Sequence, residues 1–547
     1  MKINTKIKES SGWKRYKIHK YDVWFSGYIF NEDKLATFRR IILFLNNNIS
    51  EKDDFHEWLK KIRGHFSLII SDDKNLFSMV DRIRSIPIFF NKQKNEVVIG
   101  NYAPDVSKHI ISEHQVYNKQ AALEIAMSGY TIGDKTLDLN LLQLCPGEYI
   151  IVKDNVVKVS VYYQYSPWNI RVREKSLLKK ELTEVSREIL KDVVKNADGR
   201  QIVVPLSAGN DSRFIVSGLK ELGVKDVFCF SYGIDNNFEV RTAKKISEHL
   251  GYEWLHIPLS LTTQRKYFRE KKFHDFLEFT DTLSNSQVLI DYSAVKRVKD
   301  SRKISKESIF INGNSGDFVT GGHVLDGYGI GSDAESMECL IQFIIKKHYS
   351  LWRCLKTTEN LNNIKIELNK VINKIMTSNS LSWSSFSEIG EGVEWSGRQS
   401  KFITTTQRSY EFHGYDWRLP MWDSIYMDFW EGVEKKYKIN QLLYIETLLE
   451  NNWGGVWSGI SVNDFSITSS KIRLLRGFFK LFFTFLGKDA WHIFDKRYFS
   501  YFYDDTAATA IVPYSEVMFD KCGARDRNSW IVKKYLHEKN IDIILNK

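Results

Sequence analysis

The stretch "VVPLSAGNDSRF", residues 203–214, decides the fold of this chain, because it joins an apolar strand to a helix through a run of small residues. Around it, runs of β-branched and aromatic residues alternate with segments of helical periodicity that end at glycine. The predicted strands cover 201–207, 226–233 and 254–259, and the predicted helices cover 211–223 and 238–251. This alternation predicts an α/β domain with a parallel sheet built of βαβ units.

The small residues at the end of the first strand predict a ligand site. In an open parallel sheet, ligands bind at the carboxyl ends of the strands. Residues 207–209 have little side-chain bulk, and the N–H groups that open the next helix suit a phosphate. Asp211 alone would repel a phosphate, so we expect it to hold a Mg²⁺ ion that bridges to phosphate oxygens. The alternative is an ordinary helix N-cap supplied by Asn210, Asp211 or Ser212.

Three stretches of the chain resemble ATP-using enzymes. Residues 207–212 are similar to the Ser-Gly-Gly-x-Asp-Ser loop of ATP pyrophosphatases (PP-loop enzymes), with Ala208 in place of the first Gly. "INGNSGDFVTGG" (311–322) resembles the asparagine synthetase stretch Gly-Glu-Gly-Ser-Asp-Glu-x-x-x-Gly-Gly, and "HGYDWRLPMWD" (413–423) resembles Glu-x-Arg-x-Pro-Phe-Leu-Asp of the same family. Enzymes with this loop cleave ATP to AMP and pyrophosphate and activate a carboxylate or carbonyl group as an adenylate.

The resemblance to glutamine-hydrolysing asparagine synthetases implies a site for ATP and Mg²⁺. Asp211 and Asp317 fall on metal and pyrophosphate contacts, and Asn314 falls on the catalytic glutamate of the family. The residues implied in nucleotide binding are Leu206, Ser207, Gly209, Asn210, Asp211, Ser212, Ser231, Gly233 and Gly313. The residues implied in substrate binding are Arg398, Lys401, Asp416 and Arg418, and for Arg398 and Lys401 a helix-surface position is an equal alternative.

The N-terminal part resembles the glutaminase domain of the same family. The matching landmarks are Gly27–Asn31, Gly64–Ser67, residues 80–90 and Pro146-Gly147. The resemblance implies an Ntn-hydrolase-like αββα domain over 1–165, followed over 166–547 by a doubly wound, HUP-like ATP pyrophosphatase domain with a large helical extension. The patterns of β-forming residues predict strands at 21–30, 65–71, 76–81, 86–90 and 96–100, and a hairpin at 146–163.

Several positions depart from the family pattern. Residue 2 is Lys where the glutaminase has its nucleophilic Cys, and the first cysteine is Cys145. Tyr28 replaces a glutamate of the glutaminase motif, so we expect a degenerate domain that hydrolyses no glutamine. Asn314 cannot act as a carboxylate base. The family lysine that contacts the adenylate has only Lys438 and Lys471 as candidates, each with a surface role as the preferred alternative.

The expected function is therefore ATP-dependent amide-bond synthesis, with nitrogen from ammonia, an amine or a separate glutaminase. The expected substrate is a small-molecule carboxylate, and one hypothesis is a sugar uronic acid of bacterial surface polysaccharide synthesis. The alternatives are asparagine synthesis from aspartate and amide closure of a small molecule or peptide. A non-catalytic nucleotide-binding scaffold is the remaining alternative.

Length, composition and charge limit the classes of protein to which this chain can belong. The 547 residues are too many for a single hydrophobic core. A net charge of +11 with a pI of about 9.0 fits a Lys-rich solvated surface, and the alternatives are binding of a nucleic acid, of an anionic substrate or of a membrane surface. No nucleic-acid-binding motif is present, and the five scattered cysteines argue against a disulfide framework and a zinc site. The N-terminus has no signal-peptide pattern and no stretch is long and apolar enough to span a membrane, so we expect a cytoplasmic protein.

The segment "KIRLLRGFFKLFFTFLGK" (471–488) is both basic and strongly apolar. One interpretation is an interfacial helix that makes peripheral contact with an anionic membrane. The preferred interpretation is a core helix with charged ends.

Overall fold

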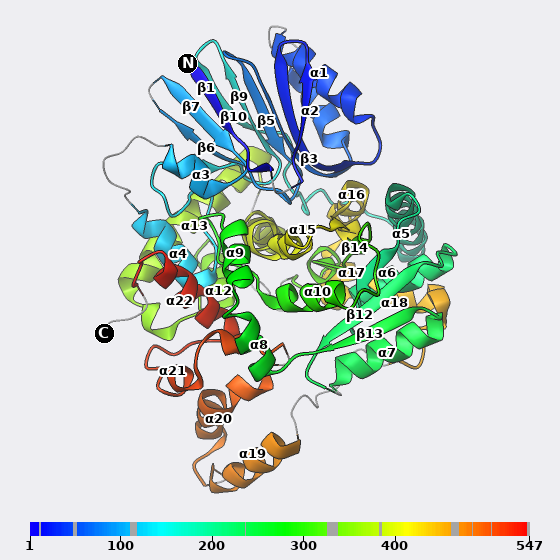
Figure 1. Ribbon diagram of the computed structural model, residues 1–547, viewed down its shortest axis with the longest axis vertical. Helices are drawn as coiled ribbons and strands as arrows, with labels where there is room; N and C mark the ends of the chain where they lie inside the picture. The colour runs from blue at the N-terminus through cyan, green and yellow to red at the C-terminus, as the bar shows by residue number, and fades with distance from the viewer. Residues whose placement is uncertain are drawn as a thin grey trace.

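The computed structural model describes residues 1–9, 12–46, 52–93, 95–109, 117–235, 237–324, 337–381, 385–460, 470–483, 485–504 and 506–543. Its described strands form three sheets, two in the N-terminal part and one in the middle of the chain, with helices around them (Figure 1). The mixed α/β character that the sequence predicts is confirmed.

In the residues that the structure describes, the N-terminal part has two sheets and four helices. Its elements are β1 (Lys2–Lys6), β2 (Lys14–Ile18), β3 (Tyr21–Ile29), α1 (Lys34–Asn46), α2 (Lys52–Lys61), β4 (Gly64–Ser71), β5 (Leu76–Val80), β6 (Phe89–Lys92), β7 (Glu96–Gly100), α3 (Ala103–Lys108), α4 (Lys119–Ser128), β8 (Leu142–Gln143), β9 (Glu148–Lys153) and β10 (Val156–Val161). Six antiparallel strands have the order β10-β9-β5-β4-β3-β2, and the other sheet has the order β1-β7-β6-β8. Helix α1 packs on β3 and β5, and α3 packs on β6 and β7.

The predicted N-terminal strands agree with these elements, with one shift. The hairpin of β9 and β10 lies within the predicted 146–163. The strand predicted at 86–90 begins only at Phe89, and Ile86 to Ile88 lie outside any strand. Pro87 lies in this stretch, and a proline has no N–H to donate to a neighbouring strand.

The middle of the chain forms a five-stranded parallel sheet. Its elements are α5 (Lys175–Ala197), β11 (Ile202–Pro205), α6 (Asn210–Glu221), β12 (Val227–Gly233), α7 (Phe238–Leu250), β13 (Glu253–Pro258), β14 (Ile309–Ile311) and β15 (Asp416–Arg418). The strand order is β13-β12-β11-β14-β15, and every neighbouring pair is parallel. The predicted βαβ units over 201–259 are confirmed. Because β12 and β14 flank β11 on opposite sides, the strand order reverses between β11 and β14.

The rest of the chain is helical, as the sequence predicts. The remaining α-helices are α8 (Leu261–Tyr267), α9 (Lys271–Phe279), α10 (Ile290–Asp300), α11 (Gly316–Val319), α12 (Met337–His348), α13 (Thr358–Asn379), α14 (Phe386–Glu394), α15 (Arg408–Phe412), α16 (Ser424–Glu431), α17 (Lys435–Lys438), α18 (Leu442–Asn451), α19 (Ser470–Phe483), α20 (Lys488–Tyr503), α21 (Tyr514–Met518) and α22 (Arg527–Glu538). A π-helical segment over Trp395–Phe402 continues α14. No helix in the described part of the chain combines the length and the apolar character needed to cross a membrane.

Two expectations from the sequence are wrong. Cys354 and Cys522 form a disulfide, with Cα atoms 4.8 Å apart, although 168 residues separate them in the chain. Spacing in the sequence could not reveal this pair, because the fold alone brings the two residues together. The preferred interpretation of 471–488 as a core helix is also wrong, since most of the apolar side chains of α19 are exposed.

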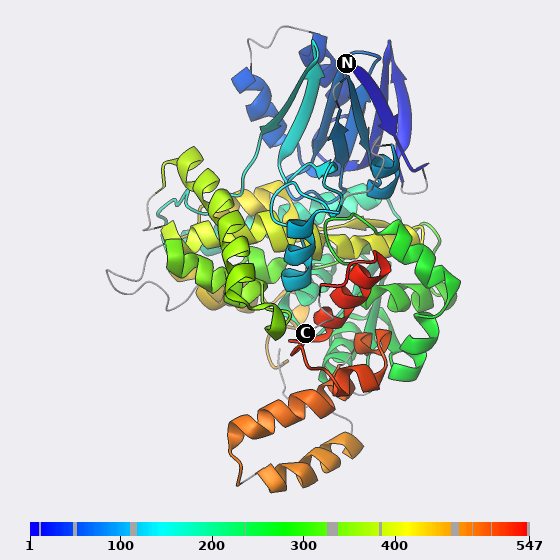
Figure 2. The same cartoon turned by 90° about the vertical axis from the view of Figure 1, so that its left-hand side faces the viewer.

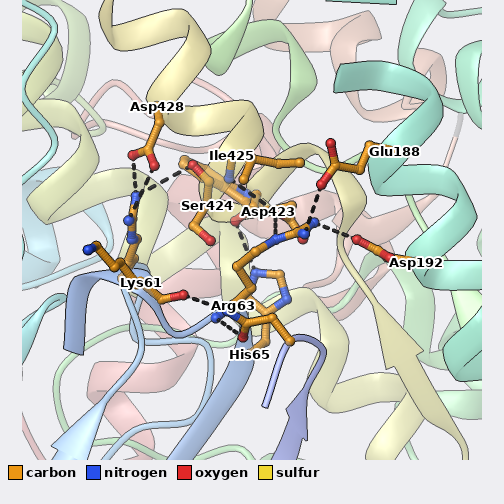
Figure 3. Close-up of polar contacts among 12 residues, drawn as sticks. Lys61, Arg63, His65, Glu188, Asp192, Asp423, Ser424, Ile425 and Asp428 are labelled. Atoms are coloured by element: carbon orange, nitrogen blue, oxygen red, sulfur yellow. Dashed lines mark hydrogen bonds and ion pairs between the residues drawn. The ribbon is translucent and has the colours of Figure 1, made fainter. Parts of the chain in front are cut away.

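A partly buried arginine ties strand β4 of the N-terminal part to helices α5 and α16 (Figure 3). Arg63, which immediately precedes β4, donates from Nε and Nη2 to the two carboxylate oxygens of Asp423 at 3.1 and 3.2 Å. It also contacts Glu188 at 3.1 Å and Asp192 at 2.7 Å, both on α5. Asp423 is buried and accepts a hydrogen bond from the N–H of Ile425 at 3.1 Å, which caps α16. One ion-pair network thus connects β4, α5 and α16.

We predict that Arg63→Met lowers the free energy of unfolding by about 3 kcal/mol, because it leaves the buried Asp423 carboxylate without a cation. Glu188→Gln is the matched control, since Glu188 is 56% exposed and its loss costs less than about 0.5 kcal/mol. Urea denaturation of the full chain measures both. Equal midpoints for the two variants would contradict the assigned role of Arg63.

Candidate functional site

The site predicted from the sequence lies where β11 and β14 end. Ile202 and Val203 of β11 pair with Ile309 and Phe310 of β14 in parallel register, so the carboxyl ends of the two strands lie at the same edge of the sheet. The loop over 206–209 follows β11, and the loop over 312–315 follows β14. Both loops therefore meet at the reversal of strand order, which is the usual ligand-binding position of such a sheet.

Internal hydrogen bonds hold the loop after β11. The N–H of Ser207 donates to the hydroxyl of Ser212 at 3.0 Å, and the N–H of Gly209 donates to the hydroxyl of Ser207 at 3.1 Å. Gly209 is the N-cap of α6 and supplies no side-chain cap. The alternative of an ordinary N-cap at Asn210, Asp211 or Ser212 is therefore wrong, because these residues lie inside the first turn. Ala208 lies outside the left-handed region, so it replaces glycine without backbone strain.

Asp211 is held in the first turn of α6 by groups from two other segments. One of its carboxylate oxygens accepts the N–H of Asp317 at 2.9 Å, and the other lies 3.3 Å from the hydroxyl of Tyr444. Burial raises the pKa of the Asp211 carboxyl to about 8, and the neighbouring charge of Asp317 adds to the rise. A nearby cation would lower this pKa and favour the ionised carboxylate.

Two glycines allow the loop after β14 to approach Asp211. A Cβ on Gly313 would lie 2.7 Å from the Cβ of Asp211, and a Cβ on Gly316 would lie 2.5 Å from its Cγ. The Cβ on Gly316 would also lie 2.3 Å from the sulfur of Met421. Only residues without a Cβ fit at these two positions, so the spacing of glycines in 311–322 has a direct structural reason.

A histidine links Asp317 to a buried glutamate. His323 has Nε2 3.1 Å from Asp317 and Nδ1 2.6 Å from Glu394. Burial opposes its protonation, but the hydrogen bonds to the two carboxylates outweigh burial and raise its pKa to about 9. Burial likewise opposes ionisation of Asp317, but the hydrogen bond and charge of His323 hold the pKa of Asp317 below its usual value. The pair is therefore an imidazolium and a carboxylate at neutral pH.

Glu394 is the centre of a compact group of charged side chains. It lies 2.9 Å from Lys347, 3.2 Å from His348 and 4.0 Å from Arg398. Hydrogen bonds and charges of His323 and His348 lower the pKa of Glu394 despite its burial. Arg398, a predicted substrate residue, belongs to this charged group through its contact with Glu394.

The predicted lysine candidates have different positions. Lys438 is buried and its Nζ lies 2.5 Å from the buried Glu391, so it is no surface lysine. A Cβ on Gly321 would lie 2.3 Å from the carbonyl oxygen of Lys438, which places α17 directly against the end of the 311–322 motif. The side chain of Lys471 lies outside the described residues.

Three other predicted residues are engaged in local contacts around the site. Asn314 donates from its side chain to the hydroxyl of Thr406 at 3.0 Å. Ser231 donates to the carbonyl of Leu206 at 2.6 Å and accepts from the indole of Trp254 at 3.0 Å, so its hydroxyl connects β12 to the end of β11. Gly233 ends β12, with a φ of 140° that favours glycine.

Three predicted substrate residues are not brought to Asp211. Asp416 pairs with Ile309 at the start of β14, which is the amino edge of the sheet, and forms an ion pair with Arg200 at 2.7 Å. Arg418 lies over the ring of Tyr28 and donates to Asn196. The buried ammonium of Lys401 donates to the carbonyl oxygens of Thr131 and Gly133. Each of these three side chains already has polar contacts away from Asp211. Its position therefore does not support a role in substrate binding.

Cys145, the first cysteine of the chain, lines a separate cavity of about 630 Å³ between β10, α13 and Trp395. Burial raises the pKa of its thiol to about 12, so the group is a neutral thiol at physiological pH. It therefore has no nucleophilic character of the kind that a glutaminase needs.

The residues that the sequence analysis did not identify are His323, Glu394 and Tyr444. His323 follows the glycine pair 321–322 directly and lies six residues after Asp317, so its position in the motif is a signal that could have indicated it. Glu394 and Tyr444 lie on α14 and α18, far from the motif in sequence, and only the fold brings them to it.

Comparison with known proteins finds only weak structural likenesses to this chain. No protein-family model matches this chain, and no curated protein matches it. A solved structure described as the allosteric regulatory enzyme of purine biosynthesis is 11% identical over 46% of this chain and 72% of that chain, with a TM-score of 0.19. A glutamine phosphoribosylpyrophosphate amidotransferase from B. subtilis, complexed with ADP and GMP, is 11% identical over 64% of this chain and 74% of that chain, with a TM-score of 0.16. Likenesses at these TM-scores support no argument about this chain.

We predict that Gly316→Ala destabilises the chain by about 1–3 kcal/mol, because the added methyl group overlaps Asp211 and Met421. Gly477→Ala is the matched control, since a Cβ at Gly477 in α19 meets no atom within 4 Å and alanine favours a helix. Thermal unfolding of both variants measures the difference. A Gly316→Ala protein as stable as the Gly477→Ala protein would mean that the loop does not approach Asp211 this closely.

Proposed function

We propose that this chain is an ATP-dependent amide-forming ligase that cleaves ATP to AMP and pyrophosphate. The observation that carries the proposal is the meeting of Asp211 and Asp317, from the loops after β11 and β14, beside the start of α6. The N–H groups at this helix start have no side-chain cap and are oriented for an anion. An anion site next to two carboxylates suits a phosphate chain that carries a divalent cation. The resemblance to the PP-loop and asparagine synthetase motifs supports the same function.

The two carboxylates fit Mg²⁺. Within the described residues, no group of three or more His, Cys, Asp and Glu side chains is placed to hold a metal ion. Mg²⁺ is commonly bound by only one or two protein carboxylates, and waters and substrate phosphates complete its coordination. Asp211 and Asp317 would hold the ion, and when bound it neutralises charge that develops on the phosphate oxygens.

The residues of the loop have distinct proposed roles. The amides at the start of α6 and the hydroxyls of Ser207 and Ser212 bind the pyrophosphate part of ATP. The imidazolium of His323 keeps Asp317 ionised and oriented. A substrate carboxylate attacks the α-phosphorus, which releases pyrophosphate and forms an acyl-adenylate. A nitrogen nucleophile then attacks the acyl carbon and displaces AMP, so catalysis is mainly positioning and charge neutralisation.

The charged groups near the site bear on which carboxylate is the substrate. Arg398 beside Glu394 suits an anionic substrate, and Asn314 provides no carboxylate base in place of the family glutamate. These features support a carboxylate other than aspartate, and we propose a sugar uronic acid that is amidated with ammonia or an amine. This choice rests on analogy. The competing reactions are asparagine synthesis from aspartate and amide closure in a small molecule or peptide. The assay below compares the carboxylate substrates of all three reactions.

A second candidate function is nucleotide binding without catalysis. It is favoured by Asn314 and Phe318, which occupy the positions of the two glutamates in the family motif. Phe318 is buried and packs near the rings of Tyr165 and Trp422, so it has a structural role instead of a chemical one.

We predict that Asp211→Asn lowers ATP–pyrophosphate exchange at least about 100-fold, because it removes the charge that holds the metal ion. Exchange is measured with a panel of uronic acids, aspartate and peptide carboxylates. Asp416→Asn is the matched control, because Asp416 belongs to a family-like motif but lies at the amino edge of the sheet. It should retain wild-type exchange.

The outcomes separate the candidates. Exchange that only aspartate stimulates rejects the uronic acid. ATP binding without exchange for any carboxylate favours the scaffold. Exchange that survives Asp211→Asn refutes the proposed site.

A further inference from the structure

Helices α19 and α20 form a hairpin that lies apart from the sheets, at the bottom of the view in Figure 2. One face of α19 packs on α20, where Phe479 and Phe483 contact Phe494 with ring centroids 5.5 and 4.6 Å apart. Arg476 forms two hydrogen bonds of 2.8 Å with the carboxylate of Asp495 on the same face. The hairpin therefore has its own internal packing, which defines how α19 is rotated.

The opposite face of α19 is apolar and exposed. Leu474, Phe478, Leu481 and Phe482 follow helical spacing along one stripe, and their exposed fractions are 76%, 57%, 69% and 60%. The stripe continues past the helix with Phe485, which is 93% exposed. Scattered single apolar residues on a surface are common, but a continuous stripe of large ones marks an interaction site.

The hairpin that carries this apolar stripe is also rich in basic residues. Between Ser470 and Ser500 the sequence has seven Lys and Arg residues against two Asp residues, a net charge of +5. Arg473 and Lys480 are exposed on α19, beside the apolar stripe, and Lys488, Lys496 and Arg497 are exposed on or next to α20. Nearly half of the net charge of +11 thus lies in this short hairpin.

We propose that the α19–α20 hairpin docks on the surface of an anionic lipid bilayer. An apolar helical face bordered by Lys and Arg is the arrangement that binds the interface of anionic lipids, where the apolar side chains enter the headgroup region and the cations contact phosphates. A second copy of this chain is a poorer occupant, because symmetric pairing would bring two surfaces of charge +5 together. At 14 residues, α19 lies on the membrane and does not span it. The inference does not depend on the proposed function.

Co-sedimentation of the full chain with lipid vesicles tests the proposal. We expect binding to vesicles of phosphatidylcholine mixed with phosphatidylglycerol, and much weaker binding to phosphatidylcholine alone. Phe478→Ser combined with Phe482→Ser should lower the partition coefficient roughly 100-fold, because each buried phenylalanine contributes a factor of about ten or more. Lys480→Gln combined with Lys488→Gln should weaken binding to the anionic vesicles roughly tenfold and leave binding to the neutral ones unchanged.

Leu43→Ser is the control for apolar exposure alone, since Leu43 is 60% exposed on α1 in the N-terminal part. It should bind vesicles like the wild type. The proposal is overturned if the wild type does not bind anionic vesicles, or if the double phenylalanine variant binds them equally well. It is also overturned if sedimentation shows a dimer that this variant abolishes while vesicles remain unbound, because the occupant would then be a second copy.

Discussion

The close approach of the loop after β14 to the first turn of α6 is the constraint on which the site depends. Gly313 and Gly316 have no side chain that would collide with Asp211, so the loop comes close enough for the backbone N–H of Asp317 to donate to the Asp211 carboxylate. This contact brings two acidic residues from opposite sides of the reversal in strand order to one edge of the sheet. Without this contact, the small residues after β11 would form an isolated anion site, and Asp211 would have no second acidic residue beside it.

Positive charge contacts Asp317 directly, whereas Asp211 has neutral hydrogen-bond partners. His323 is positively charged beside Asp317, and Glu394 holds His323 in place while it also contacts Lys347 and His348. The hydrogen-bond donors to Asp211 are neutral, the N–H of Asp317 and the hydroxyl of Tyr444, and burial and the charge of Asp317 raise its pKa. In the proposed function, Mg²⁺ would supply positive charge to Asp211, whose hydrogen-bond partners are neutral.

The sequence predicts some parts of this arrangement well and others not at all. Strands β11, β12 and β13 and helices α6 and α7 are predictable, because each has a clear period and a glycine or small-residue boundary. Strands β14 and β15 have three residues each, too few for a periodic pattern. The place of Lys401 against the carbonyls of Thr131 and Gly133 depends on packing between distant segments, as does the Cys354–Cys522 pair. The period of 471–488 predicts a helix but does not tell whether another element covers its apolar face.

The most direct test of the central claim is calorimetric titration of ATP into the full chain, with Mg²⁺ and with Mg²⁺ removed by chelation. We predict saturable binding at one site in the presence of Mg²⁺ and binding at least about tenfold weaker without it, since no divalent cation then offsets the charge of the phosphates beside Asp211 and Asp317. Failure to bind ATP at any Mg²⁺ concentration, or equal binding with and without the ion, would contradict the account.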